Sequence, residues 1–265
     1  MWLNLPRLMP GFIVIGAQRC GTSSVYHYLI QHPCVLRASV KEIHYFDIDF
    51  CKGTAWYRTH FPSVRRKYLT KLSCRRNVVT GEATPYYIFH PWAPERAWKT
   101  VPRSKLIVML RNPVDRAYSH YHLEVKLGNE TLSFEDAIER EEERLNGEKN
   151  KILRDKSYYS FNYQHYSYIS RGAYVDQLKA WSEFFPNEQM LIIKSEDFYS
   201  DPPGTMKYIF DFLGLPNRQL RSYRKYYAIN YPNMDANTRK RLISYFEPYN
   251  RRLYGYLRVN FGWDK

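Results

Sequence analysis

The sequence predicts an α/β fold: a single domain with a central, mostly parallel sheet flanked by helices. Apolar, β-branched runs of strand length alternate along the chain with longer segments of helical spacing, an order typical of parallel sheets covered on both faces. The chain has 265 residues, enough for one substantial hydrophobic core. Because no repeat and no linker-like change of composition interrupts it, residues 1–265 are expected to form one domain.

The most informative stretch is FIVIGAQRCGTSS, at residues 12–24. Phe12–Ile15 predicts a buried strand. Gly16 and Gly21 bound the loop that follows, and helical spacing begins at Thr22. Such a unit directs successive backbone N–H groups and the positive end of a helix dipole toward one point. The stretch therefore predicts an anion-binding loop.

This loop nearly matches the phosphate-binding pattern G-x-x-x-x-G-K-[ST], but Thr22 occupies the lysine position. That lysine normally reaches the β- and γ-phosphates of a nucleoside triphosphate, so its loss argues against hydrolysis of ATP or GTP. The nearest cation is Arg19, inside the loop. Taken alone, the loop fits an ordinary strand–helix turn with incidental glycines equally well.

The following elements begin or end at local signals. His32-Pro33 ends the first helix, and a short apolar piece, Cys34–Leu36, comes after it. Asn112 at the N-cap and Pro113 at the first helical position begin a later helix. Further strands are expected at Val78–Glu82, Lys105–Leu110 and Met190–Lys194.

Helices dominate the second half of the chain. Ser133 and Asp136 resemble a capping box that opens a charged helix, Phe134–Leu145. The polar segment Gly147–Ser167, rich in Lys and Tyr, is expected to be a loop. The other helices expected are one with an apolar face from Tyr174 to Phe185, one at Asp201–Leu213 closed by Gly214, and a last one capped by Asp235, which Pro248 bends or divides.

The composition is strongly basic. Forty Lys and Arg residues against 26 Asp and Glu give a formal net charge of +14. This excess favours polyanionic partners: nucleic acid, sulfated or uronic-acid glycans, anionic lipid or an anionic nucleotide cofactor. A basic surface kept for solubility accounts for the charge as well, so charge alone does not choose a partner.

The cysteines indicate neither a disulfide framework nor a metal site. They are Cys20, Cys34, Cys51 and Cys74, with no C-x-x-C pair and no Cys/His set at zinc spacing. Cys20 lies in the anion loop, where a free thiol fits best, and this indicates a reducing compartment. No stretch approaches the length of a membrane helix, and Met1–Ile15 lacks a signal-peptide pattern, so a cytoplasmic protein or a shortened chain is expected.

Ligands of parallel sheets bind beyond the carboxyl ends of the strands. Candidate groups follow three predicted strands: the 16–23 loop, Glu82 and Arg111. Ser119 lies about two helical turns beyond Arg111 and can face the same crevice. A guanidinium and a hydroxyl there would bind a second phosphate group, apart from the first. The alternative is a salt bridge between Arg111 and Asp115, with Ser119 a plain helix hydroxyl.

Five motifs together resemble one enzyme family. GAQRCGTSS, KEIHYFD, LRNPVDRAYSHY, SRGAY and YPNMD, in this order, resemble the PAPS-dependent sulfotransferases, most closely the heparan-sulfate N- and 3-O-sulfotransferase branch and its bacterial relatives. The resemblance extends from about Phe12 to Trp263. It implies the P-loop-kinase-like sulfotransferase fold, the donor 3′-phosphoadenosine 5′-phosphosulfate (PAPS) and the product PAP.

The resemblance also implies which residues bind the cofactor. The matching positions are Arg19, Cys20, Gly21, Thr22 and Ser23 in the 5′-phosphosulfate loop, Arg111 and Ser119 at the 3′-phosphate, and Tyr231 in the C-terminal loop. Arg19 stands where many members have lysine. Tyr227 and Ile229 replace basic residues of the glycan N-sulfotransferases, and no cysteines flank this loop.

The catalytic roles follow by the same resemblance. Glu42 matches the glutamate taken as the catalytic base of the heparan-type branch, and His44 is the second candidate because the small-molecule branch uses a histidine. In-line sulfuryl transfer is expected, with Glu42 taking the proton of an acceptor hydroxyl or amine. Arg19 would stabilise the leaving phosphate, Lys41 would assist the sulfonate or the base, and no metal is needed. The structural alternative for Glu42 is a solvated acid paired with Lys41.

The charge and the resemblance favour a glycan or another extended anionic acceptor, with the segment Lys149–Arg171 as its wall. Bacterial relatives of this kind also modify lipids, antibiotics and polyketides, so the fold does not fix the acceptor. Two other functions fit parts of the sequence. A P-loop nucleotide kinase requires a lysine after Gly21, which is absent. A nucleic-acid-binding module would use the +14 charge and 25 tyrosines, but it requires no ordered set of groups at strand ends. The motifs favour the sulfotransferase, with no nucleic-acid partner and no membrane span.

Overall fold

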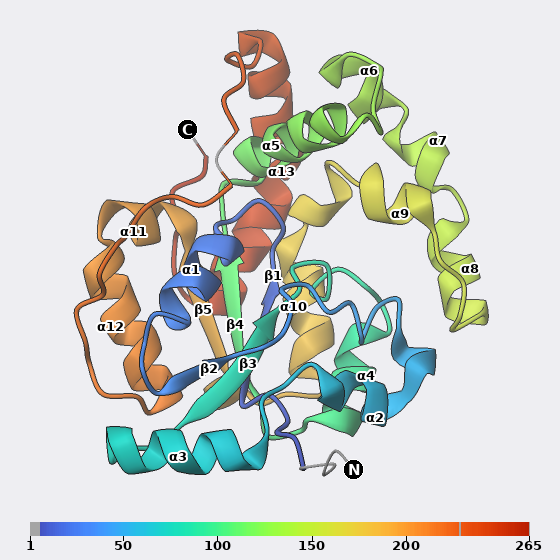
Figure 1. The fold of residues 1–265 in the computed structure, drawn as a ribbon. Helices are drawn as coiled ribbons and strands as arrows, with labels where there is room; N and C mark the ends of the chain where they lie inside the picture. Colours follow the sequence, from blue (N-terminus) through green and yellow to red (C-terminus); the bar gives the residue numbers. More distant parts are fainter. Residues whose placement is uncertain (1–5, 228, 265) are drawn as a thin grey trace.

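The computed structural model describes residues 6–227 and 229–264. Its centre is a five-stranded sheet in the order β2-β3-β1-β4-β5, and every neighbouring pair is parallel (Figure 1). The strands are β1 (Phe12–Gly16), β2 (Val35–Arg37), β3 (Val79–Ala83), β4 (Lys105–Leu110) and β5 (Met190–Lys194). The expected α/β class with a mostly parallel sheet is confirmed.

The central strand β1 is buried along its whole length, as a strand covered on both faces must be. Phe12 lies opposite Gly81 of β3 on one side and Lys105 of β4 on the other. Because all five strands run the same way, their carboxyl ends meet along one edge of the sheet. The loops after β1, β3, β4 and β5 are therefore brought together there, while the amino ends of the strands form the opposite edge.

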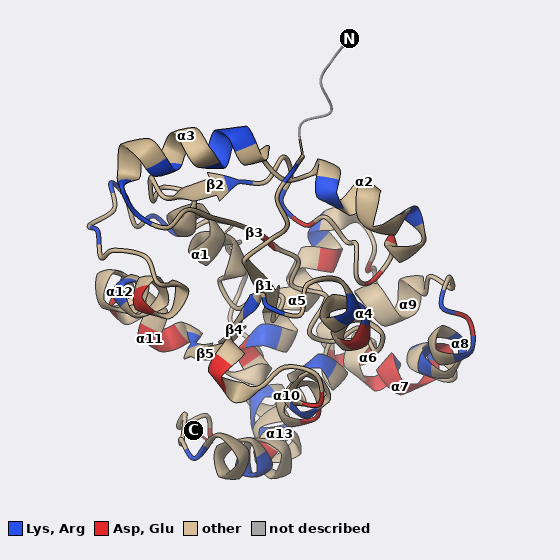
Figure 2. Ribbon diagram, turned by 90° about the horizontal axis from the view of Figure 1, so that it is seen from below, with Lys and Arg blue, Asp and Glu red and all other residues tan. Residues whose placement is uncertain are grey.

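Helices cover both faces of the sheet, as Figure 1 and the view from below in Figure 2 show. The helices α1 (Thr22–Leu29) and α12 (Pro202–Leu213) lie on one face, and α4 (Ala93–Thr100) and α10 (Tyr174–Ser182) lie on the other. The long helix α13 (Ala236–Leu257) packs against α10. The main hydrophobic core fills the space between these layers.

The segment between β4 and β5 forms a helical cap at the carboxyl edge, at the upper right of Figure 1. Its helices are α5 (Pro113–Leu127), α6 (Phe134–Glu139), α7 (Glu141–Leu145), α8 (Glu148–Arg154) and α9 (Phe161–His165). The other short helices are η1 (Phe50–Lys52), α2 (Gly53–Thr59), α3 (Val64–Cys74), η2 (Ser170–Gly172), η3 (Asn187–Gln189) and α11 (Ser195–Ser200). Among the described helices, none has the length and apolar character needed to cross a bilayer.

The expected helix starts are confirmed by side-chain caps. Asn112 accepts a hydrogen bond from the amide of Val114 at 3.0 Å. Ser133 accepts one from the amide of Asp136 at 3.1 Å. Asp235 likewise accepts from the backbone at the start of α13. Each cap satisfies N–H groups that have no partner within the helix.

One helix prediction needs correction, and one of two alternatives for another helix is excluded. The expected helix Phe134–Leu145 is divided at Arg140 into α6 and α7. At the start of α7 the side chain of Glu141 turns inward, where its carboxylate accepts the amides of Ile169 and Ser170 at 2.6 and 2.8 Å. In contrast, Pro248 does not divide α13, which continues as one helix through it.

The segment Gly147–Ser167, expected to be a loop, contains α8 and α9. Ile152 of α8 and Tyr163 of α9 are buried together against Tyr86, which follows β3. Burial of one such side chain contributes about 1.5–3 kcal/mol, which stabilises helices that are too short to form alone. This contact is distant in sequence, so the polar local composition gave no sign of it.

Candidate functional site

The loop after β1 presents unpaired backbone donors. Gly21 is the N-cap of α1, has φ of 90° and carries no side chain to cap the helix. The N–H groups of the first turn therefore lack helical partners, and the dipole places positive potential at the same point. A Cβ at Gly21 would lie 2.8 Å from the hydroxyl of Tyr199. Both the backbone angle and the lack of space require glycine here.

A first cavity of about 320 Å³ opens over this loop. All the cofactor-binding residues expected from the sequence line it, except Cys20. Arg19 Nε donates to Ser119 Oγ at 3.0 Å, and Arg111 Nη1 donates to the carbonyl of Arg19 at 3.5 Å. These contacts join the loop after β1 to the end of β4 and to α5. The cavity thus brings together two cations and a row of amide donors.

Arg111 forms no ion pair with a carboxylate of the described residues. Asp115 forms its ion pair with Arg239, at 2.8 Å, so the alternative in which Asp115 pairs with Arg111 does not describe this structure. Burial disfavours the charged form of Arg111, but the Tyr231 hydroxyl and the Asp115 carboxylate outweigh burial and raise its pKa. Burial lowers the pKa of Arg19. Two guanidinium groups with few carboxylates nearby favour a ligand with several negative charges.

Cys20 lies beneath the loop and not in the cavity. Its Sγ is 3.8 Å from the hydroxyl of Tyr174, and its amide donates to the carbonyl of Ala17 at 3.2 Å. Burial raises the pKa of the Cys20 thiol to about 11, so the group is a neutral thiol. Its motif position suggested a cofactor contact, but both its side chain and its amide face the protein.

The C-terminal loop after α12 forms part of the lining of the first cavity. The ring of Tyr231 stacks on His122 of α5, with centroids 4.6 Å apart and planes at 3°. Tyr226 stacks on His27 of α1 at 4.1 Å, and its amide donates to Ser24 Oγ at 3.1 Å. Aromatic packing therefore anchors this loop, in which Tyr227 and Ile229 replace basic residues and no cysteines form a disulfide.

A second cavity of about 330 Å³ adjoins the first. The catalytic candidates Lys41, Glu42 and His44 line it. The two cavities share four lining residues, Arg19, Thr22, Ser23 and Tyr227. The structure thus places the carboxylate of the KEIHYFD motif and the anion-binding loop in adjoining spaces.

Glu42 is part of a chain of polar side chains. Its carboxylate contacts Lys41 Nζ through one oxygen, and its other oxygen lies 3.8 Å from His44 Nε2. The Nδ1 of His44 is 2.8 Å from Asp47 Oδ2. Burial disfavours the imidazolium, but the contact with Asp47 and the charges of Glu42 and Glu82 outweigh it and raise the pKa of His44. The contact with Asp47 therefore favours the protonated form of His44 beside Glu42.

The backbone around Glu42 and His44 has an uncommon conformation. Glu42 and His44 have φ of 62° and 55°, in the left-handed region that residues other than glycine rarely adopt. The amide of Glu42 donates to the carbonyl of Ala83 at 3.0 Å, which ties the segment to the end of β3. Such conformations persist only where the surrounding structure determines them.

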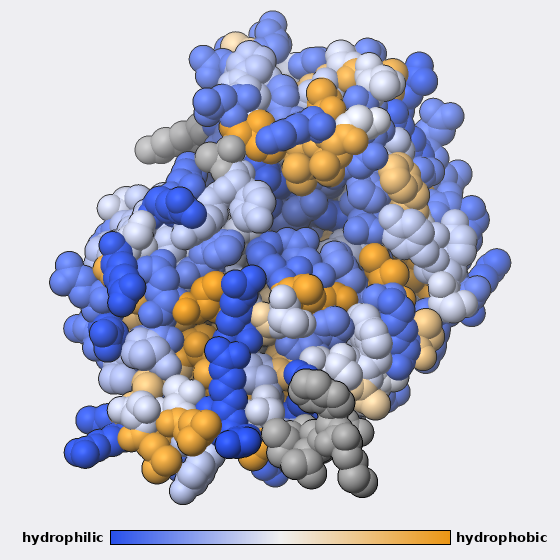
Figure 3. Space-filling view, in the orientation of Figure 1, coloured by the Kyte–Doolittle hydropathy of each residue, from blue (hydrophilic) through white to orange (hydrophobic). Residues whose placement is uncertain are grey.

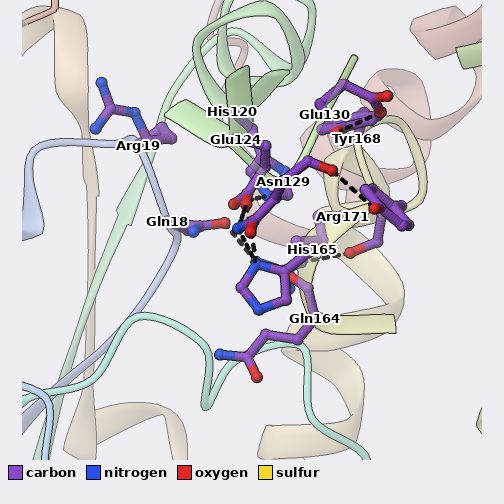
Figure 4. Close-up of polar contacts among 12 residues, drawn as sticks. Gln18, Arg19, His120, Glu124, Asn129, Glu130, Gln164, His165, Tyr168 and Arg171 are labelled. Carbon is purple, nitrogen blue, oxygen red and sulfur yellow. Dashed lines mark hydrogen bonds and ion pairs between the residues drawn. The ribbon is translucent and has the colours of Figure 1, made fainter. Parts of the chain in front are cut away.

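Arg171 forms the far wall of the second cavity (Figure 4). Its side chain is buried and donates to Gln18 Oε1, to Ser167 Oγ and to the carbonyl of Gln164. Its guanidinium also lies over the ring of Tyr86 at 4.7 Å. Burial lowers the pKa of Arg171 to about 10, so it remains a cation at neutral pH, and no carboxylate of the described residues forms an ion pair with it.

A polar cluster behind this wall supports it. Figure 4 shows the side chains of Glu124, Asn129 and His165 together, with Glu124 Oε2 2.9 Å from His165 Nδ1 and 2.7 Å from Asn129 Nδ2. Both donors reach the same carboxylate oxygen, and His120 lies 3.3 Å from the other. The cluster joins α5 to α9, and so it holds Gln164 and the following residues in position against the cavity.

Glu82, the remaining strand-end candidate, does not line either cavity. Its side chain is fully buried and accepts from Tyr57 at 2.6 Å, Thr84 at 2.7 Å and Tyr87 at 3.2 Å. Burial outweighs these hydrogen bonds and raises the pKa of Glu82 to about 7. Its expected place in the crevice is therefore wrong: β3 directs this side chain into the protein.

Sequence reasoning missed several residues of the site. Glu196 and Tyr199 line the first cavity directly after β5. Ligands of parallel sheets bind beyond the carboxyl ends of the strands, so the position of these two residues after a predicted strand was a usable signal. Gln18 and Arg171 lay within recognised motifs, GAQRCGTSS and SRGAY. Lys225 and Tyr226 had no local signal, because their position depends on the path of the C-terminal loop.

The fold places a basic cavity beside a cavity that contains a carboxylate, and comparison with known proteins gives the family of the chain. Residues 10–250 match the sulfotransferase domain family. The chain therefore belongs to the sulfotransferase family, which confirms the class of enzyme expected from its motifs. This membership favours the sulfotransferase over the kinase and nucleic-acid-binding alternatives.

Individual relatives agree with this family. The chain is 27% identical to the membrane-associated sulfotransferase kil1 of Dictyostelium discoideum, over 97% of this chain and 67% of kil1. It is 29% identical to mouse heparan sulfate glucosamine 3-O-sulfotransferase 3B1, over 97% of this chain. The chain spans 65% of the length of that mouse enzyme. The crystal structure of a sulfotransferase from Alicyclobacillus acidocaldarius has a TM-score of 0.74 and 29% identity, covering 97% of this chain and 100% of that chain.

The buried carboxyl of Glu82 predicts a specific dependence of stability on pH. The pKa of Glu82 rises from 4.5 to about 7 on folding, so the folded state binds this proton more tightly than the unfolded state. The contribution to stability is therefore greatest below pH 4.5 and is lost as the pH rises to about 7. Glu82→Gln should remove this loss and be more stable than the wild type at pH 8 by about 1–3 kcal/mol.

Urea unfolding followed by circular dichroism, at several pH values, measures this difference. The two proteins should converge in acid and diverge above neutrality. A variant that is less stable than the wild type by the same amount at every pH would mean that the three hydroxyl donors keep Glu82 ionised.

Proposed function

We propose that the chain transfers the sulfuryl group of PAPS to a hydroxyl or amine of an anionic glycan, by in-line displacement with Glu42 as the base. The observation that carries this proposal is that the two cavities meet at the loop after β1. One cavity offers donors suited to phosphate groups, and the other offers a carboxylate. The shared residues are where donor and acceptor would come into contact.

The first cavity fits a nucleotide with two separate phosphate groups. The amides of Gly21, Thr22 and Ser23 would hold the 5′-phosphosulfate, and Arg111 with Ser119 would hold the 3′-phosphate. When bound, PAPS supplies an activated sulfuryl group. Among the residues that line this cavity, Arg19, Arg111 and Lys225 are cations and Asp115 and Glu196 are the carboxylates, so positive charge exceeds negative and a polyanionic nucleotide is favoured.

The residues of the second cavity support acid–base catalysis. Glu42 would accept the proton of the acceptor group, and Lys41 beside it would stabilise charge on the sulfonate. The contact of His44 with Asp47 favours the protonated imidazole, which cannot accept a proton, so Glu42 is the better candidate for the base. Arg19, which lines both cavities, would stabilise the charge that develops on the leaving phosphate.

The charge of the second cavity supports an anionic acceptor. Lys41, Arg19 and Arg171 line it, and Glu42 is its one carboxylate among the described residues. The relatives named as heparan sulfate sulfotransferases act on such a glycan by name, which supports the same class here. The expected acceptor wall, Lys149–Arg171, supplies Gln164 and Arg171 to this cavity. A reducing, cytoplasmic location belongs to the same proposal and is supported by four free cysteines.

The donor is tested by the binding of PAP in calorimetry, against ATP with Mg²⁺. PAP should bind without Mg²⁺, and Arg111→Ala should weaken binding about 10- to 100-fold, because it removes a charged hydrogen-bonding partner of the 3′-phosphate. Arg103→Ala, an exposed arginine before β4, is the matched control and should bind like the wild type. A preference for ATP with Mg²⁺, or equal binding by both variants, would contradict the assignment.

The base is tested by Glu42→Gln. Transfer of labelled sulfate from PAPS to heparan sulfate chains should fall about 10²- to 10⁴-fold, as is typical when a general base is removed. PAP affinity should not change, because Glu42 lines only the second cavity. Glu188→Gln, on the exposed η3, serves as control. Residual activity close to that of the wild type would assign the base to another group, whereas no activity in the wild type itself would refute only the acceptor.

The acceptor wall is tested by Arg171→Gln in the same assay. Loss of this buried cation should raise KM for heparan sulfate about 10- to 100-fold, while PAP affinity stays within a factor of about two of the wild type if Arg171 acts on the acceptor alone. Arg154→Gln changes an exposed arginine of the same segment and should leave KM unaltered. If PAP affinity and transfer fell equally, Arg171 would instead act by holding the loop after β1 in position, through its hydrogen bond to Gln18.

A further inference from the structure

The helix α3 exposes its apolar side chains to solvent. Val64, Tyr68 and Leu72 are four residues apart, so they form one stripe along the helix, and Leu69 lies beside it. The exposed fraction is 43% for Val64, 61% for Tyr68, 58% for Leu72 and 52% for Leu69. No residue of α3 is buried, and its half-buried positions include the polar Lys67.

This pattern is the reverse of that of an ordinary surface helix. A surface helix normally places its apolar stripe against the core and its charged residues in water. The helices α12 and α13 follow this rule: α12 buries Met206, Ile209 and Phe210, and α13 buries Leu242 and Phe246. The apolar stripe of α3 is therefore not explained by packing within the described part of the chain.

The same helix and the turn after it are strongly basic. Their cations are Arg65, Arg66, Lys67, Lys71, Arg75 and Arg76, and residues 64–76 contain no Asp or Glu. None of the six forms an ion pair within residues 6–227 and 229–264. The arginines of α13 differ, since Arg239, Arg241, Arg251 and Arg252 each pair with a carboxylate.

The figures show the two properties on one surface. In Figure 2, α3 carries blue segments and no red ones, and it lies at the outside of the molecule beyond β2. Figure 3 shows a hydrophobic patch at the lower left, over α3, next to hydrophilic side chains.

We propose that α3 is a docking site for the surface of an anionic lipid bilayer. The basic residues would lie among the lipid head groups, and the apolar stripe would enter the boundary with the acyl chains. A nucleic acid or a free glycan would satisfy the charges, but it offers nothing apolar to bury four exposed side chains. The combination of unpaired cations with an outward apolar stripe is complementary to charged lipid.

The position of α3 fixes how the protein would sit on the membrane. The helix leads into the start of β3, so it lies at the amino edge of the sheet, whereas the two cavities lie at the carboxyl edge. Docking through α3 would leave both cavities open to solution. An acceptor would therefore reach the site from the aqueous side, and nucleotide binding would not compete with lipid.

Co-sedimentation of the full chain with lipid vesicles tests the proposal. The protein should bind vesicles of phosphatidylcholine with phosphatidylserine and fail to bind phosphatidylcholine alone. Tyr68→Ser with Leu72→Ser, and separately Arg75→Gln with Arg76→Gln, should each weaken vesicle binding about tenfold or more. Lys240→Gln with Arg251→Gln removes two exposed charges of α13 and is the matched control, expected to bind like the wild type.

Circular dichroism of every variant checks that the fold is intact, and the affinity for PAP should be the same with and without vesicles. Two results would overturn the proposal. One is failure of the wild type to bind anionic vesicles. The other is binding that depends on the arginines but not on Tyr68 and Leu72, together with equal binding to duplex DNA or heparin, which would make α3 a site for soluble polyanions. This test uses no acceptor, so its outcome is independent of the proposed sulfuryl transfer.

Discussion

The unpaired N–H groups at the start of α1 are the feature on which the rest of the site depends. They exist because Gly21 ends the loop in a left-handed conformation and no side chain caps the helix. The parallel sheet brings the ends of β3, β4 and β5 to the same edge. Arg111, the segment containing Glu42 and the residues after β5 therefore surround the loop, although the chain separates them widely.

The site is rich in positive charge that the protein itself does not neutralise. Arg171 is buried among neutral acceptors and the ring of Tyr86. Arg19 donates a hydrogen bond to a hydroxyl and Arg111 donates one to a carbonyl, and neither acceptor carries a charge. Burying cations in this way is costly unless opposite charge is added. An anionic ligand would relieve that cost in each cavity, so part of the binding free energy is already stored in the arrangement of the free protein.

The parts that could be predicted from the sequence are those set by local signals. A buried strand such as Lys105–Leu110 and a cap such as Asn112 depend on neighbours in the chain, and both were found. The division of the helix at Arg140 and the helices α8 and α9 depend on contacts with distant residues. Glu82 and Cys20 show a further limit for the site: a motif gives the position of a residue along a strand or loop, but not the side to which its side chain points.

The net charge of +14 has more than one role in this fold. The arginines of α13 are paired with carboxylates and join helices, while those around the two cavities face the space for anionic ligands. The cations of α3 belong to neither group, since they surround exposed apolar side chains at the opposite edge of the sheet. Charge kept only for solubility would be spread over polar surfaces and would not require that apolar stripe. The distribution therefore separates a site for chemistry at one edge from a surface for attachment at the other.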